Sequence, residues 1–285
     1  MKNYQGIYIN LAKSKDRDAY IRSHLSQIQM LKYFKRFDAI DGTYINAPSN
    51  AKINPHEIAC YDSHLQAMKQ GEGKHIHIIE DDVCLSQNFR FIIEPFLDFQ
   101  ETQEWDIVFF GINVPIVREL YEVLLAQKYT ENNFKVLDLQ PFGDLYAGFY
   151  SYIVNRHSVN KITHLLEEGK YNLSVDMKIR SYIYENKIKA FATLPLLSIH
   201  QHNLFDTTIP HREVNHKLLL PKQHFFLAQK LFFADNYHKH QDLYKELMQY
   251  LKNKHHLVTK KPIDNPSFEE VAEYFLKSIY PYVKN

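Results

Sequence analysis

The segment HIHIIEDDVCLSQNF, residues 75–89, places three adjacent carboxylates, Glu80, Asp81 and Asp82, directly after a short apolar run. Adjacent negative charges repel, and holding them near the end of a buried strand lowers stability unless a cation or hydrogen-bond donors compensate. Mg²⁺ and Mn²⁺ prefer oxygen ligands and are commonly shared between carboxylates and substrate phosphates, where they act as Lewis acids. The alternative is an acidic turn that caps a following helix, because acidic residues favour helix N-termini. The segment alone leaves both interpretations open and favours the helix cap.

The elements that would position these carboxylates follow from the apolar pattern. Strand-like runs occur at residues 6–11, 34–40, 75–79, 105–111, 134–139, 146–155 and 189–200. Helical stripes or caps occur at residues 16–31, 54–71, 117–127, 158–168 and 174–186. Such alternation predicts an α/β fold with an open, mainly parallel, twisted sheet flanked by helices. Ligands of such sheets bind beyond the carboxyl ends of the strands, where the acidic triplet falls.

Composition excludes several classes of protein. The chain has 285 residues, of which 45% are hydrophobic and 14% aromatic, as expected of a folded globular protein. Its formal net charge of +1 argues against a general polyanion binder, and its two cysteines form no disulfide framework. We find no apolar run long enough to span a bilayer and no signal-peptide pattern, and therefore expect a cytoplasmic protein.

The region from residue 216 to residue 285 has a different texture, with amphipathic segments rich in Phe, Tyr and Lys. We predict a helical C-terminal extension here. Its lysines and aromatic residues could rest on anionic lipid at the cytoplasmic face of a membrane. Packing on the catalytic core or on a second subunit, as in a homodimer, explains the pattern equally well.

Several segments, in order along the chain, resemble those of glycosyltransferase family 25, the lipopolysaccharide and lipooligosaccharide glycosyltransferases. The matching segments are IYINLAKSKDRDAYI (7–21), FDAIDG (37–42), INPHEIACYDSHLQAMK (53–69), HIIEDDVCLSQNF (77–89), GFYSYIVNRHSVNKI (148–162), SVDMKI (174–179) and, more loosely, PLLSIHQHNLFDTTI (195–209). This collinear order over residues 6–210 is far more specific than any single motif, and it reverses the preference for a helix cap.

The resemblance implies a GT-A-type fold. Residues 1–215 would form the catalytic domain, with the nucleotide-sugar half at about 1–112 and the acceptor half at about 113–215. Residues 216–285 match no part of the family and remain the helical extension.

The resemblance also implies a metal and nucleotide site. Glu80-Asp81-Asp82 would act as the family's acidic metal motif, with Asp82 as the direct ligand of Mn²⁺ or Mg²⁺ and with Glu80 assisting. Asp81 would contact the metal, the ribose or the donor sugar.

Four further residues are expected to bind the nucleotide: Asn10, Arg17, Ser63 and His64. Arg17 would use charge-assisted hydrogen bonds. A late histidine, His202 or His200, would complete the metal site.

An inverting transfer requires a base that takes the proton from the acceptor hydroxyl. Asp176 occupies the matching Val-Asp position and is the first candidate, and Asp144 is the second. The structural alternative for Asp176 is an acidic residue in the first turn of a helix, favoured there by the helix dipole.

The expected function is a metal-dependent, inverting transfer of a hexose, most simply galactose, from a UDP-sugar to a sugar of a lipid-linked lipooligosaccharide acceptor. Two alternatives stay open. One is a metal-dependent phosphatase or nucleotide-sugar hydrolase, and the other is a non-catalytic protein that binds sugar nucleotides. The sequence contains no recognised nucleic-acid-binding motif.

Overall fold

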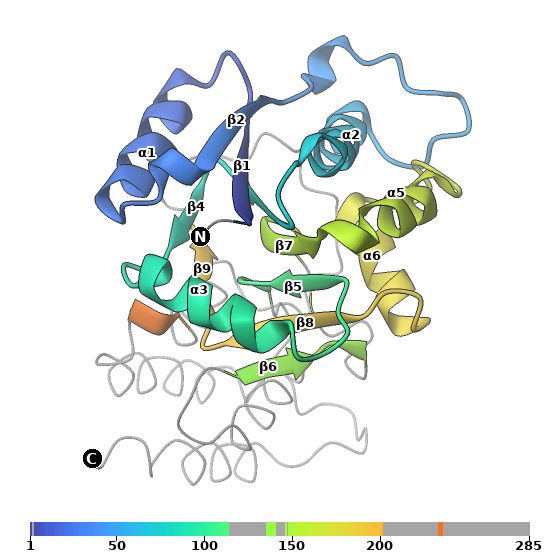
Figure 1. Cartoon of the computed structure of the whole chain (residues 1–285). Helices are drawn as coiled ribbons and strands as arrows, with labels where there is room; N and C mark the ends of the chain where they lie inside the picture. The colour runs from blue at the N-terminus through green and yellow to red at the C-terminus, as the bar shows by residue number, and fades with distance from the viewer. Residues whose placement is uncertain (2, 114–134, 141–145, 147, 202–232, 236–285) are drawn as a thin grey trace, which may run out of the picture.

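The computed structural model describes residues 1, 3–113, 135–140, 146, 148–201 and 233–235. Its centre is a seven-stranded sheet in the order β2-β1-β3-β7-β5-β8-β6 (Figure 1). The strands are β1 (Tyr4–Asn10), β2 (Phe34–Asp38), β3 (His75–Glu80), β5 (Ile107–Phe109), β6 (Lys135–Asp138), β7 (Ser151–Asn155) and β8 (Ala190–Leu194). Within this part of the chain β1, β2, β3, β5 and β8 run in one direction, and β7 and β6 oppose them. The predicted open, mainly parallel α/β sheet is confirmed.

Helices cover both faces of this sheet (Figure 1). On one face α2 (Pro55–Gln70), α5 (Val159–Glu167) and α6 (Val175–Tyr184) enclose a core that contains Ile7 and Phe109. On the other face α1 (Lys15–Gln27) and α3 (Phe89–Gln100) enclose a core that contains Tyr8, Val108 and Phe110. Successive residues of one strand therefore point into different cores, because the side chains of a β-strand alternate between the two faces of the sheet.

Helix α2 shows how directly local sequence can set an element. The Asn54 side chain accepts hydrogen bonds from the amides of His56 and Glu57, and the Glu57 carboxylate accepts one from the Asn54 amide. This is the predicted capping box, with Pro55 at the first helical position. Gly71 has φ of −63°, and a Cβ there would meet the Ile76 side chain at 2.5 Å, so close packing and not a left-handed cap requires glycine.

The segment after the acidic triplet is a strand, which contradicts the interpretation of the triplet as a helix cap. The chain passes from β3 through a turn into β4 (Val83–Leu85), so the triplet does not cap a following helix. β4 pairs with β9 (Ser198–His200) in a separate two-stranded antiparallel sheet. Neither β4 nor α3 was predicted from the sequence. Arg90, Glu94 and Asp98 are spaced by four along α3, which is a helical signal, but Pro95 lies inside the helix and counts against a helix in the sequence.

The remaining strand predictions hold with shifted ends. The run at 146–155 forms a strand only at Ser151–Asn155, and the run at 189–200 divides into β8 and β9 around Pro195. The predicted helix at 117–127 lies outside the described residues, and so does the extension at 216–285 apart from residues 233–235. Strands from both expected halves share one sheet, since β3 pairs with β7. None of the described helices combines the length and apolar character of a transmembrane span.

Candidate active site

The acidic triplet lies at the carboxyl edge of the sheet, beside the end of β1. β1 and β3 are parallel neighbours, with Ile9 opposite Glu80. Asn10 therefore reaches the turn that follows β3, and its amide nitrogen donates to the Asp81 carboxylate at 2.8 Å. Asn10 is itself held by Arg36, whose Nε donates to the Asn10 side-chain oxygen at 2.9 Å. This edge is where open α/β sheets bind ligands.

The β4–β9 pair brings a distant histidine to the triplet. Val83 pairs with His200, and the Gln201 amide donates to the Asp82 carbonyl at 2.8 Å. As a result His200 Nδ1 lies 3.1 Å from Asp82 Oδ1. Ligand atoms of Glu80, Asp82 and His200 all lie within 4.8 Å of one another. Two carboxylates and one imidazole thus converge on one small volume.

Arg17, near the start of α1, contacts two of the three carboxylates. Its Nη2 donates to Asp82 Oδ2, and its Nε lies 3.2 Å from Asp81 Oδ1. The two oxygens of Asp82 are thereby divided, with Oδ2 facing Arg17 and Oδ1 facing His200. Arg17 supplies much of the charge compensation that adjacent carboxylates need.

The pKa values of Asp81 and Asp82 shift in opposite directions. Burial raises the pKa of Asp81 to about 6, against the opposing effects of Arg17 and Asn10. Burial acts in the same direction on Asp82, but His200 and Arg17 outweigh it and hold the pKa of Asp82 below its ordinary value. For His200, burial favours the neutral ring, and the Asp82 and Glu80 carboxylates outweigh it and raise the pKa. Of the two aspartates, Asp82 therefore stays ionised to the lower pH.

Helix α2 contributes a second side of the site. His64 is buried, and its Nε2 lies 3.4 Å from Glu80 Oε1 while its Nδ1 lies 3.0 Å from the Tyr152 hydroxyl. Ser63, which is also buried, donates to the Ala59 carbonyl at 2.7 Å and accepts from the Ile40 amide at 2.9 Å. The bond to Ala59 lies within α2, and the bond from Ile40 joins α2 to the loop that follows β2.

Asp176 lies in the first turn of α6, after the N-cap residue Ser174. The Ser174 side chain makes no cap hydrogen bond. Burial first, and then the charges of Glu80 and Asp176, raise the pKa of the Cys60 thiol on α2. Both carboxylates therefore lie near enough to Cys60 for their charges to act on its thiol.

Comparison with known proteins identifies the family. The family model of glycosyltransferase family 25, described as LPS biosynthesis proteins, matches residues 4–179, which is more than half of the chain. The chain belongs to glycosyltransferase family 25. No curated protein matches the sequence. The suspected resemblance is confirmed, and with it the general activity of a glycosyltransferase.

Solved structures show only distant likeness to this family 25 chain. A Bacillus anthracis protein assigned as a glucose-1-phosphate thymidylyltransferase, bound to sucrose, is 10% identical at a TM-score of 0.34, covering 65% of this chain and 66% of that chain. Residues 1–349 of TarS from S. aureus are 12% identical at a TM-score of 0.31, covering 98% and 81%. The TarS complex with UDP-GlcNAc is 11% identical at a TM-score of 0.29, covering 98% and 82%. This family 25 chain spans about two thirds of the first protein.

The predicted site residues of the family 25 chain fall into three groups. The structure brings together Glu80, Asp81, Asp82, Asn10 and Arg17 at one edge, with Ser63 and His64 on the adjacent helix. Asp176 relates to them through its effect on Cys60. Asp144 and His202 lie outside the described residues. Their roles stay predictions, as do the nucleotide contacts of Asn10, Arg17, Ser63 and His64.

The sequence alone gave too little weight to two residues near the acidic triplet, His200 and Cys60. His200 was an alternative to His202, and its place beside Asp82 depends on the unpredicted pairing of β4 with β9. Cys60 was overlooked, although its spacing of four residues from His64 on a well-marked helix is a signal that places both side chains on one face.

Proposed function

We propose that this family 25 member is a metal-dependent, inverting glycosyltransferase that moves a hexose, most simply galactose, from a UDP-sugar to a sugar of a lipooligosaccharide acceptor. The convergence of Glu80, Asp82 and His200 at the carboxyl edge of the sheet carries this proposal. The family supplies the reaction class, and the carboxylate-rich donor set supplies the metal requirement.

The residues present fit a divalent cation. Glu80 and Asp82 offer hard oxygen ligands, and His200 offers a nitrogen, as Mn²⁺ accepts. Asp82 is best suited as the direct ligand, because its pKa is held low and its Oδ1 points to the shared volume. A bound Mn²⁺ or Mg²⁺ would supply Lewis-acid stabilisation of the charge that develops on the departing diphosphate.

The surrounding residues would hold this arrangement before substrate arrives. Arg17 fixes Asp82 through Oδ2, and Asn10 and Arg17 together fix Asp81. A site whose ligands are already oriented loses little free energy in rearrangement when charge develops. In this proposal Asp81 orients the turn, and it faces the ribose or the donor sugar through its remaining lone pairs.

Asp176 would act as the base. In an inverting displacement the acceptor hydroxyl attacks the anomeric carbon from the side opposite the departing UDP, while a carboxylate takes the hydroxyl proton. Support for this role comes from the family-like Val-Asp position of Asp176 and from the effect of its charge on Cys60, on which the charge of Glu80 also acts. Asp144 remains the second candidate for the base or for acceptor binding.

The test is a panel of nucleotide sugars measured with and without Mn²⁺. UDP-galactose with Mn²⁺ should raise the melting temperature and release UDP when a lipooligosaccharide acceptor is added, whereas UDP-glucose and UDP-GlcNAc should do so less. At a ligand concentration of about 100 times Kd, stabilisation should reach about 3 kcal/mol, and EDTA should remove it. Absence of stabilisation by every UDP-sugar in the presence of Mn²⁺ would reject the proposal.

The same panel separates the alternatives. A nucleotide-sugar hydrolase would release the sugar at the same rate with or without acceptor, and a non-catalytic binder would be stabilised without releasing UDP. Family 25 membership also supports an oligosaccharide acceptor. We also propose that the acceptor is linked to a lipid. In this proposal the protein contacts the inner membrane from the cytoplasm and forms a homodimer.

A further inference from the structure

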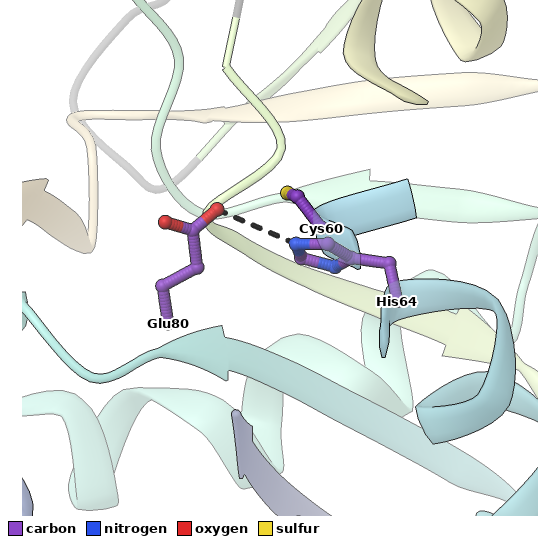
Figure 2. A group of neighbouring side chains, drawn as sticks. All are labelled: Cys60, His64 and Glu80. Atoms are coloured by element: carbon purple, nitrogen blue, oxygen red, sulfur yellow. Dashed lines mark ion pairs between the residues drawn. The ribbon is translucent and has the colours of Figure 1, made fainter. Parts of the chain in front are cut away.

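A second group of metal-binding side chains lies next to the carboxylate site. Cys60 and His64 project from α2, one turn apart, toward Glu80 at the end of β3 (Figure 2). The Cys60 Sγ, one His64 ring nitrogen and one Glu80 oxygen all lie within 4.8 Å of one another. Figure 2 shows the imidazole of His64 pointing at the Glu80 carboxylate, with the sulfur on the same side of the ring.

We infer that Cys60, His64 and Glu80 form a binding site for Zn²⁺, distinct in chemistry from the carboxylate site with which it shares Glu80. Thiolate and imidazole ligands favour Zn²⁺ over Mg²⁺ or Mn²⁺, and three protein ligands leave a fourth position for water or another ligand. Zn²⁺ at this site has no role in the chemistry of the proposed transfer reaction, although the site shares Glu80 with the metal site of that reaction.

The distances suit a tetrahedral ion. Usual Zn–N, Zn–O and Zn–S bond lengths place neighbouring ligand atoms roughly 3.3–3.6 Å apart. His64 Nε2 and Glu80 Oε1 already have this spacing, at 3.4 Å. The other separations stay within 4.8 Å, so shifts of about 1 Å would complete the geometry.

The surroundings support His64 as a ligand. A histidine that binds zinc through Nε2 carries its proton on Nδ1 and donates it to a neighbouring acceptor. The Tyr152 hydroxyl lies 3.0 Å from Nδ1, and Tyr152 and His64 are both buried. Phe149 packs against the other part of the ring, with centroids 5.2 Å apart. The ring orientation is therefore fixed before any ion binds.

The charges also balance. Zn²⁺ with one thiolate, one carboxylate and a neutral imidazole forms a complex with no net charge, which suits a position where His64 is buried and Cys60 and Glu80 are partly buried. Without the ion, burial and the Glu80 charge keep the Cys60 thiol protonated by raising its pKa. Binding would replace the thiol proton with Zn²⁺ and release that proton to solvent.

Sharing of Glu80 predicts antagonism between the two sites. A Zn²⁺ ion that engages Glu80 withdraws one ligand from the group formed with Asp82 and His200. Micromolar Zn²⁺ should therefore weaken Mn²⁺ binding to the carboxylate site, and substitution of Cys60 should relieve this effect.

The decisive experiment uses Co²⁺ as a spectroscopic substitute for Zn²⁺ on the full-length, metal-free protein, with a phosphine reductant in place of thiols. Wild type should show a thiolate-to-cobalt charge-transfer band that Zn²⁺ abolishes. Cys60→Ser should lose the band and bind Zn²⁺ on the order of 10–100-fold more weakly in competition with a chromophoric chelator. Cys84→Ser is the matched control, because Cys84 is the other cysteine of the chain, and it should keep both properties.

Three outcomes would overturn the inference. These are a wild-type protein without a thiolate band, a band that survives in Cys60→Ser, and a band that disappears in Cys84→Ser. Thermal unfolding of each variant checks that it is folded. His64→Gln should reproduce the loss of Zn²⁺ affinity by a change that leaves the thiol in place. None of these readouts requires a nucleotide sugar, so failure here is distinguishable from failure of the proposed function.

Discussion

Two histidines with little exposure to water, His77 and His200, differ in how their pKa values shift. His77 of β3 lies among aromatic rings, with its Nδ1 2.5 Å from the Tyr4 hydroxyl, and burial lowers its pKa to about 3. The His200 side chain is only 10% exposed, but Asp82 and Glu80 raise its pKa above the ordinary value. Both rings are largely removed from water, but among the residues that the structure describes a carboxylate acts on His200 and none acts on His77. The neighbouring charge, and not the depth, therefore makes one region a packing cluster and the other a candidate site.

The largest expected effect lies in the carboxylate region. Asp176→Asn should lower kcat by on the order of 10²–10⁴, because it removes the proposed base while keeping the shape of the side chain. Donor binding, measured by the Mn²⁺-dependent shift in melting temperature, should be unchanged. Glu185→Gln, at the other end of α6, is the control. Equal loss of donor binding and turnover would reject the assignment of Asp176.

Asp82→Asn should reduce Mn²⁺-dependent donor binding by about 100-fold or more, since even an outer-shell partner of a metal is worth roughly 10–100-fold in affinity. Calorimetric titration of UDP with Mn²⁺ measures this loss. Asp38→Asn serves as the control, because Asp38 ends the neighbouring strand β2 with an exposed side chain. Unchanged titrations for Asp82→Asn would remove Asp82 from the metal site.

Substitution of His77, which lies among aromatic rings, should change the free energy of unfolding and leave metal binding unchanged. The unfolded state binds a proton at His77 near pH 6.5, whereas the folded state does so only near pH 3. The stability that depends on a neutral His77 is therefore present above pH 6.5 and is lost as the pH falls toward 3. Between pH 7 and pH 4.5 this loss should reach about 2–3 kcal/mol.

Urea unfolding of wild type and His77→Gln at these two pH values measures the difference. The variant should lose about 2–3 kcal/mol less than wild type over the same interval. His157→Gln, which alters an exposed histidine, should follow wild type. Identical pH dependence in wild type and His77→Gln would show that His77 is not kept neutral by its surroundings.

The smallest effect concerns the hydroxyl that contacts His77. Tyr4→Phe should lower the free energy of unfolding by about 1–3 kcal/mol, because a buried ring nitrogen of His77 loses its partner. Tyr44→Phe, at an exposed tyrosine, should change it by less than about 0.5 kcal/mol. Both variants should retain the Mn²⁺-dependent response to donor, and loss of that response in Tyr4→Phe would couple the two regions.

Local signals carried much of the fold. The Asn54 cap, Pro55 and Glu57 were sufficient to place the start of α2, since the hydrogen bonds of a cap join residues that are close in sequence. The strands of the sheet were visible as apolar runs, although their ends shifted by a few residues. Helix α3 was missed although its charged residues recur every four positions; its internal Pro95 is a residue that usually breaks a helix.

For the acidic triplet as well, the sequence determined one part of the site and the tertiary structure determined the other. The residue types and order of Glu80, Asp81 and Asp82, within a collinear set of family segments, determined the family, the reaction class and the expected metal motif. Only the tertiary structure decided which partners they meet. His200 reaches Asp82 through the pairing of β4 with β9, and Cys60 meets Glu80 across the packing of α2 on β3. Such contacts join residues distant in sequence, so they depend on strand register and helix packing, which local composition does not encode.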